Sequence, residues 1–158
     1  MKQLNLEKIR ATLERVPDEF EGLVAQIGFP QGQHYPDGTN VAFVASVHEF
    51  GAPGANVPAR PFMRPTVKAQ KDTWVNIVKS GIPKVVAGQL TAFDVLDAVG
   101  IQGAADVQET ISKVTSPPLS PITIARKGSA KPLIDTGQMF ASVRNSVAPA
   151  GATFTDKG

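Results

Sequence analysis

Cysteine is absent from this chain of 158 residues, and aromatic residues make up only 6% of it. Without cysteine the protein has neither a disulfide framework nor a thiolate metal site, which is consistent with folding in a reducing cytoplasm. Histidine occurs only twice, at His34 and His48, so at most two imidazole ligands could contribute to a metal site. An apolar core must therefore supply the stability, and a chain of this length is long enough to form one.

Long apolar runs are also missing. No stretch approaches the roughly 20 apolar residues that a membrane-spanning helix requires. Charged residues occur within Met1 to Arg15, where a secretory signal peptide would carry its apolar region. We therefore expect a protein that is made in the cytoplasm and contacts no membrane. One domain over 1–155 and a frayed tail at 156–158 are expected.

The net charge is only +2, but its sign alternates along the sequence. Residues 1–50 carry four Lys or Arg against seven Asp or Glu, and residues 51–90 carry six against one. Residues 91–125 carry one against four, and residues 126–158 carry five against two. Such blocks suit subunits that meet head to tail, with an ordinary solvated surface of mixed charge as the alternative.

The apolar spacing predicts an α+β fold, in which helices pack over one face of a small antiparallel sheet. We expect four main helices, each with its apolar residues on one side, over 5–16, 40–50, 64–79 and 91–114. Pro17 is expected to end the first helix, and Gly81 with Pro83 the third. The fourth keeps its phase through Gly100 and Gly103, which favours one long helix over two shorter ones.

Strands are predicted where the apolar period changes to two or where turn residues bound a short run. These are a strand over 23–29, a short strand over 122–125, and a hairpin of 141–148 with 152–155. Proline-rich connectors join the elements, and the loops over 30–38 and 126–132 are polar.

The most informative stretch begins with H-E-F-G at 48–51 and ends with V-P-A-R-P-F-M-R-P at 57–65. Its prolines fix the backbone and remove hydrogen-bond donors, so this connector is rigid. It therefore holds Arg60, Phe62 and Arg64 in set directions. Phe62 is predicted to be a core anchor, with an interface knob as the alternative.

These two motifs resemble those of the tailed-phage virion morphogenesis proteins, the neck and tail-completion family that includes minor tail protein Z-like and head–tail joining proteins. A second resemblance is P-L-S-P-I-T-I-A-R-K-G followed by P-L-I-D-T-G-Q-M, from Pro118 to Met139. Together the two segments span over half the chain in the family's order. Neither is catalytic in the family, so the resemblance implies an architectural role.

The resemblance also implies a ring, of six subunits or a multiple, located in the virion at the head–tail junction. Its partners would be further copies of itself, the phage connector or stopper, and the tail terminator or tail tube. Candidate interface residues are His48, Glu49, Phe50, Gly51, Arg60, Pro61, Phe62 and Arg64. We most expect Arg60, which lies between two prolines, to reach a neighbouring subunit.

Basic residues follow on the next helix. Arg64, Lys68 and Lys71 are spaced i, i+4 and i+7, which places them on one face. Facing a channel, they would contact the phosphates of passing DNA without reading its sequence. Facing a neighbour, they would pair with an acidic block, which we favour because a channel that ejects DNA should not hold it tightly.

Catalytic motifs are weak in this sequence. Asp135, Thr136 and Gly137 imitate the aspartic-protease D-T-G, but that chemistry needs two carboxylates, and only 21 residues follow Gly137. A helix cap and turn is the favoured interpretation. His48 and Glu49 begin a zincin-like H-E-x-x-H, but position 52 is Ala, so the second ligand is missing. Polar contacts at a helix end are the favoured role for these two residues.

The sequence thus predicts a structural virion protein that needs no cofactor or metal and is not an enzyme. A capsid or prohead assembly factor of the same phage class is the nearest alternative. An aspartic protease and a DNA-binding regulator are the alternatives from other classes.

Overall fold

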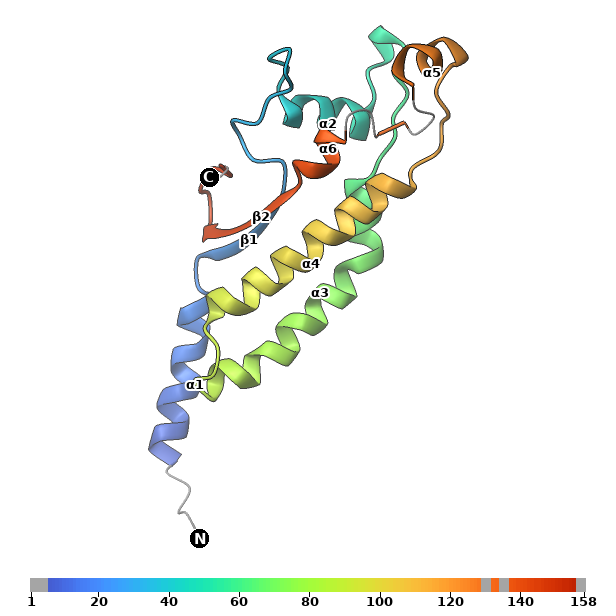
Figure 1. Ribbon diagram of the computed structural model, residues 1–158. Coiled ribbons are helices and arrows are strands. Elements are labelled where there is room, and N and C mark those ends of the chain that lie inside the picture. The colour runs from blue at the N-terminus through green and yellow to red at the C-terminus, as the bar shows by residue number, and fades with distance from the viewer. Residues whose placement is uncertain (1–5, 129–131, 134–136, 156–158) are drawn as a thin grey trace.

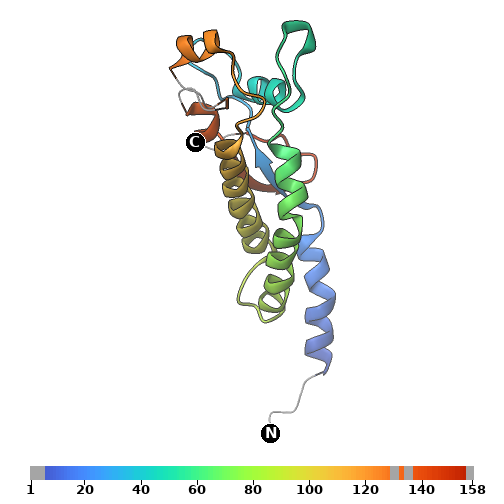
Figure 2. The ribbon, with the colours of Figure 1, turned by 90° about the vertical axis from the view of Figure 1, so that its right-hand side faces the viewer.

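The computed structural model describes residues 6–128, 132–133 and 137–155 of the chain. Two long helices, α3 (Met63–Val86) and α4 (Ala92–Lys113), lie side by side and run antiparallel (Figures 1 and 2). The antiparallel strands β1 (Leu23–Gly28) and β2 (Arg144–Pro149) pack on α4, which lies between them and α3 (Figure 1). The predicted α+β fold with a small antiparallel sheet is confirmed.

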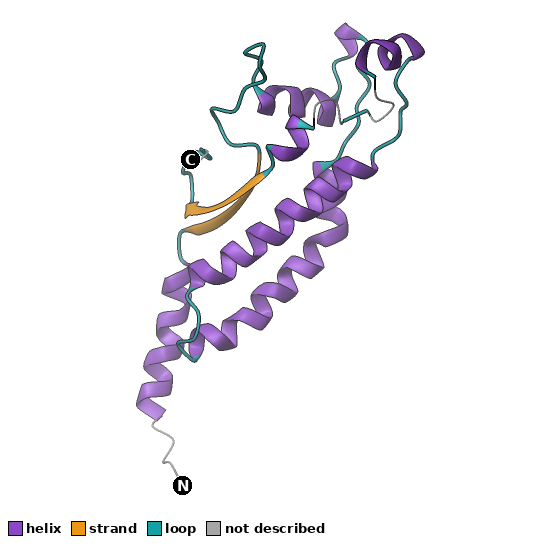
Figure 3. Ribbon diagram, in the orientation of Figure 1, coloured by secondary structure: helices purple, strands orange, loops and turns teal. Residues whose placement is uncertain are grey.

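The shorter elements gather at the two ends of this layered body. Helix α1 (Leu6–Phe20) extends beyond the turn that joins α3 to α4 (Figure 1). The opposite end carries most of the loops and the other short helices (Figure 3). These helices are α2 (Val41–Phe50), the 3-10 turn η1 (Pro53–Ala55), α5 (Pro121–Lys127) and α6 (Gln138–Ala141).

Helix α4 is a single helix, as its unbroken apolar phase predicts. Its start is fixed by a complete capping box, because Thr91 and Asp94 each accept the other's backbone N–H. Gly100 and Gly103 face the sheet, where a Cβ at Gly100 would lie 2.9 Å from Nδ2 of Asn145 and one at Gly103 would collide with Ile27. The glycines therefore allow the sheet to approach the helix closely.

Two predicted helix ends are wrong. Helix α1 continues through Pro17 to Phe20, and α3 continues through Gly81 and Pro83 to Val86. Gly81 is packed against Val95 of α4, so its missing side chain serves a helix–helix contact rather than a break. Tertiary packing thus outweighs the local preference of glycine and proline in both helices.

Two predicted strands are also wrong. Residues 122–125 lie in α5, which Ser120 caps by accepting the N–H of Thr123. The expected hairpin of 141–148 with 152–155 does not form, because β2 pairs with β1 instead, from Leu23 opposite Pro149 to Gly28 opposite Arg144. Thr155 forms an isolated parallel bridge with Gln31.

The core has two parts. One lies where α1 meets α3 and α4, and its buried members are Val16, Val85 and Val95. The larger part joins α2, α4 and the segments near β2, with Val41, Ala45, Phe62, Val107, Ile111, Leu133, Met139 and Val143 buried. This larger cluster supports the loop-rich end. The expected frayed residues 156–158 lie outside the described residues.

Candidate functional site

The H-E-F-G motif forms the joint between α2 and α3. Glu49, at the end of α2, is 5% exposed and points its carboxylate at the first turn of α3. One oxygen accepts the backbone N–H of Phe62 at 2.7 Å and of Met63 at 2.9 Å. The other accepts the backbone N–H of Arg64 at 3.2 Å and its Nε at 2.8 Å. One carboxylate thus satisfies three of the unpaired donors at a helix start.

The charge of Glu49 is held by these contacts. Burial raises the pKa of its carboxyl, but hydrogen bonds from the Arg64 side chain and from the N–H groups of Met63, Phe62 and Arg64 lower it by more. The net result is a pKa below the ordinary value of 4.5. A carboxylate at a helix N-terminus also interacts favourably with the helix dipole. Glu49 is therefore an ionised structural cap.

Gly51 allows the chain to turn back sharply after α2. Its φ is 78°, and a Cβ there would lie 2.9 Å from the backbone nitrogen of Ala59. The N–H of Arg60 donates to the carbonyl of His48 at 2.6 Å, which ties the connector to the helix end. The two motifs therefore pack directly on each other.

Arg60 is turned inward. Its side chain is 5% exposed, and Nε donates to the carbonyl of Pro117 at 2.8 Å while Nη2 donates to that of Pro118 at 3.2 Å. Burial lowers the pKa of its guanidinium. The expectation that this side chain extends toward a neighbouring subunit is thus not met in the single chain. Arg60 instead holds the second proline-rich segment against the first.

Phe62 is 1% exposed and meets the ring of Phe29 edge to face, with the centroids 5.9 Å apart. The prediction of a core anchor is confirmed. Pro61, directly before it, is exposed.

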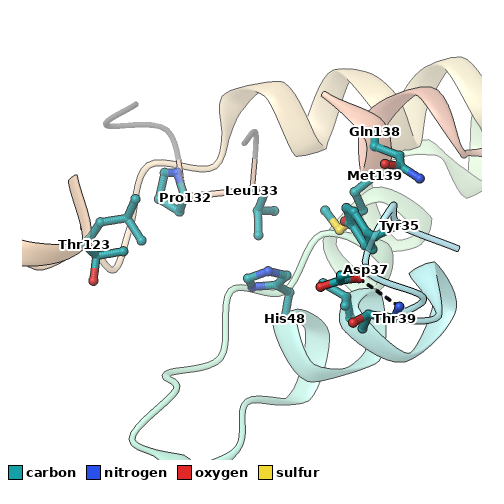
Figure 4. A pocket seen from close by; sticks show the side chains of 11 residues that line it. Tyr35, Asp37, Thr39, His48, Thr123, Pro132, Leu133, Gln138 and Met139 are labelled. Carbon is teal, nitrogen blue, oxygen red and sulfur yellow. Dashed lines mark hydrogen bonds between the residues drawn. The ribbon is translucent and has the colours of Figure 1, made fainter. Parts of the chain in front are cut away.

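The second segment returns to the same end of the molecule. Leu133 and Met139 are buried beside Val41, and the side-chain amide of Gln138 donates to the carbonyl of His34 at 2.6 Å. Between this segment and α2 lies a pocket of about 340 Å³ (Figure 4). Its lining includes Tyr35, Asp37, His48, Leu133 and Met139, and the Asp37 carboxylate accepts the N–H of Thr39 at 2.9 Å. The loop 30–38 and the second segment therefore meet across this pocket.

The outward side of the joint carries exposed aromatic rings. Phe43 and Phe50, two turns apart on α2, are 63% and 67% exposed. The Arg64 guanidinium carbon lies 5.1 Å from the Phe50 ring centroid, so this cation stacks on the ring. Phe50 also borders two hollows, one of about 240 Å³ toward Phe62 and Met63 and one of about 640 Å³ over the connector. We call Phe43, Phe50 and the smaller hollow the aromatic patch.

The predicted basic face forms on α3. Arg64, Lys68 and Lys71 are all exposed. Arg64 is paired with Glu49, and no salt bridge between described residues involves either lysine. The lysines are therefore available to a partner.

Of the D-T-G segment, the structure describes only Gly137. Asp135 and Thr136 lie outside the described residues, whereas Gly137 has a φ of 77° and precedes the first residue of α6. Within the described part of the chain, no group of three or more His, Asp or Glu side chains could hold a metal ion. No helix in that part combines the length and apolar character needed to cross a bilayer.

Sequence reasoning missed a partly buried polar link between the long helices. Trp74 Nε1 donates to Asp106 at 2.7 Å, and the hydroxyl groups of Thr66 and Thr110 lie 2.6 Å apart. Asp106 interrupts the apolar stripe of α4, and the single tryptophan faces it from α3. The carboxylate on the apolar side of a predicted helix was the sequence signal that could have revealed this link. This link fixes the position of α4 relative to the start of α3.

Comparison with protein-family models, with curated proteins and with solved structures gives no match for this chain.

Proposed function

We propose that this protein is a structural component of a tailed-phage virion, acting at the head–tail junction as a neck or tail-completion protein. It is made in the host cytoplasm and assembles as a closed ring, of six subunits or a multiple. The ring joins the connector or stopper to the tail terminator or tail tube. The proposal rests on the resemblance of two sequence segments to that family and on how these segments fold.

One observation carries the proposal: the two family-like segments form a single unit. Glu49 caps the helix that the first segment begins, and Arg60 binds the carbonyl of Pro118 in the second segment and that of Pro117 directly before it. Leu133 of the second segment packs beside Val41 of α2, the helix that ends in the H-E-F-G motif. Contacts between segments so distant in the chain build a firm platform at one end of the molecule. Such a platform is suited to docking, because a preformed surface loses little conformational entropy when it binds.

The aromatic patch supplies the contact surface of this platform. Exposed aromatic rings beside a hollow are typical of residues that anchor protein–protein interfaces. Phe50 is held in place by the Arg64 cation, so its ring is presented in a defined direction. We infer that the aromatic patch contacts the connector or the tail component.

The protein is proposed to have no enzymatic activity and to contact DNA at most without sequence preference. Asp135→Asn tests the first point, since assembly of a non-enzymatic component should tolerate the loss of this single carboxylate. An aspartic protease would lose all turnover with the same substitution.

The experiment is to block synthesis of this protein during phage growth and to examine the products by electron microscopy. We expect full heads and finished tails that are not joined, and joining restored when the protein is supplied from a plasmid. Infectious, joined particles formed without the protein would contradict the proposal. Missing or malformed heads would instead indicate the capsid or prohead assembly role.

A further inference from the structure

Helix α3 carries an exposed stripe of three lysines and two aliphatic residues. Its members are Lys68, Lys71, Val75, Lys79 and Ile82, which we call the basic stripe. Their spacing of i, i+3, i+7, i+11 and i+14 is that of a seam along which one helix packs on another. Val75 is 47% exposed and Ile82 is 40% exposed, so the apolar members are not covered within the chain.

The basic stripe turns away from α4. Helix α3 meets α4 through Thr66, Trp74 and Gly81, which share another arc of the helix. The salt bridges between described residues do not include Lys68, Lys71 or Lys79. The stripe therefore offers three cations and two uncovered side chains to a partner, with the exposed carboxylate of Asp72 at its edge.

Helix α4 carries a second exposed stripe of opposite charge. Its members are Asp94, Ala98, Ile101, Ala105 and Glu109, which we call the acidic stripe. They are spaced i, i+4, i+7, i+11 and i+15, again the spacing of a helix-packing seam. Ile101 is 58% exposed, and the small alanines on either side of it let another helix approach closely. The side chain of Asp97, on the edge of this stripe, adds a further carboxylate that accepts a hydrogen bond from Asn145.

The two stripes match in length, charge and register. Each is roughly 22 Å long, because an α-helix rises about 1.5 Å per residue. Val75 lies at the centre of one and Ile101 at the centre of the other, so the two meet whether the helices run parallel or antiparallel. In either direction Lys68 faces Asp94 or Glu109 at an end of the acidic stripe. Both carboxylates are exposed, although that of Asp94 also accepts the N–H of Thr91 and that of Glu109 also pairs with Lys113. The match is between different surfaces, which is what a head-to-tail contact requires.

We propose that the basic stripe of one copy of this chain docks on the acidic stripe of the next copy. This inference rests on the proposed ring, and it names the surface that closes that ring. A second copy fits better than DNA because Val75 and Ile82 occupy the stripe between the cations, whereas a phosphate backbone offers them no apolar partner.

The chain has no cysteine, so introduced cysteines report this contact directly. Phage would be grown with the Val75→Cys/Ile101→Cys double variant, and the purified particles would be oxidised and resolved by non-reducing electrophoresis. We expect a ladder of covalent multimers of this chain, whose top band counts the copies in the ring. Each single variant should remain monomeric, because equivalent positions do not meet in a head-to-tail contact.

Three outcomes overturn the inference. They are dimers formed by Val75→Cys alone, dimers formed by Ile101→Cys alone, and no ladder from the double variant in particles that contain the protein. Each of these leaves the proposed virion role intact. If the protein is absent from particles, the proposed function fails, and the same oxidation of concentrated purified protein decides the inference: a ladder supports it and its absence overturns it.

Charge reversal tests the electrostatic part of the same contact. Lys68→Glu with Lys79→Glu, added to the double cysteine variant, should lower the yield of multimers about tenfold at low salt. The matched comparison is Lys68→Glu alone against Lys84→Glu, which changes the net charge equally and lies at an exposed position of α3 outside the stripe. An equal loss of multimers with Lys84→Glu would overturn the pairing, because it would reflect net charge alone.

Discussion

Glu49 explains the structural role of the H-E-F-G motif. Its carboxylate accepts hydrogen bonds from the start of α3, and the Arg64 Nη2 donates to the Glu49 carbonyl at 3.0 Å. The sequence motif H-E-F-G thus has a structural explanation: the acid caps the next helix, and the glycine lets the connector return beside it. His48 and Glu49 could be predicted as polar contacts at a helix end, but the capped helix could not be.

Removing the charge of Glu49 should destabilise the fold. Glu49→Gln keeps the size of the side chain but replaces one acceptor oxygen with a donor that faces the N–H groups of α3. We expect the free energy of unfolding to fall by about 2 kcal/mol, with most of the loss from the cap, because the Arg64 partner is solvent-exposed. Urea denaturation measures the change. The control Glu109→Gln, which breaks an exposed pair with Lys113, should cost less than about 0.5 kcal/mol.

The same carboxylate should make stability depend on pH. The folded-state pKa of Glu49 lies below its ordinary value of 4.5, so its stabilising effect is complete above that value and is lost as pH falls through the folded pKa. We expect the stability difference between the wild-type protein and Glu49→Gln to shrink steadily on acidification below pH 4.5. Denaturation series at several pH values test this. A difference that stays constant from neutral pH to pH 2 would contradict the role of the ionised cap.

Arg60 marks the limit of residue-level prediction. Its position between two prolines correctly indicates a fixed side-chain direction, but not which direction. The carbonyls that receive it, on Pro117 and Pro118, lie far along the chain, and nothing local to Arg60 points to them. A buried arginine bound to backbone carbonyls depends on the tertiary fold.

Among the elements, the α3–α4 contact depends most closely on a single residue. Gly81 faces Val95, and a Cβ at position 81 would lie 2.6 Å and 2.8 Å from its two methyl carbons. Valine is stiff at χ1 and Val95 is only 2% exposed, so it has little room to move. The glycine that local rules assign to a helix break is therefore required for packing.

Gly81→Ala should consequently destabilise the protein, although alanine is the better helix former by about 1 kcal/mol. The overpacking outweighs this preference, and we expect a net loss of about 1–2 kcal/mol in thermal or urea unfolding. Val95→Ala should relieve the clash, so the double variant should be more stable than the sum of the two single changes. Gly54→Ala, at a site open to solvent, is the control and should change stability by less than about 0.5 kcal/mol.

The elements that could be predicted are those with strong local signals. The helix over 91–114 follows from its unbroken apolar phase and Thr91, and α2 from its spacing and Asn40, whose side chain accepts the N–H of Phe43. The pairing of β1 with β2 could not be predicted, since the strands are separated by most of the chain. In α5 the signal was present, because Ser120 before Pro121 is a helix start, but its β-branched residues favoured a strand.

At the scale of the whole molecule, the alternating charge blocks of the sequence lie on different helices. The basic block contributes the lysines on α3, and the following acidic block contributes the carboxylates on α4. The two helices lie side by side, so one molecule presents both signs on different surfaces (Figure 1). Such a molecule is suited to assembly with copies of itself, and in that arrangement its loop-rich end stays available for other contacts.

The most direct test of the proposed function is to locate the protein in intact particles. Purified phage would be labelled with gold-conjugated antibody against this chain and viewed by electron microscopy, with tails and empty heads as separate samples. We predict label confined to the junction between head and tail, in equal amount on every complete particle. Complete, infectious particles that lack this polypeptide, by labelling and by mass spectrometry, would contradict the account.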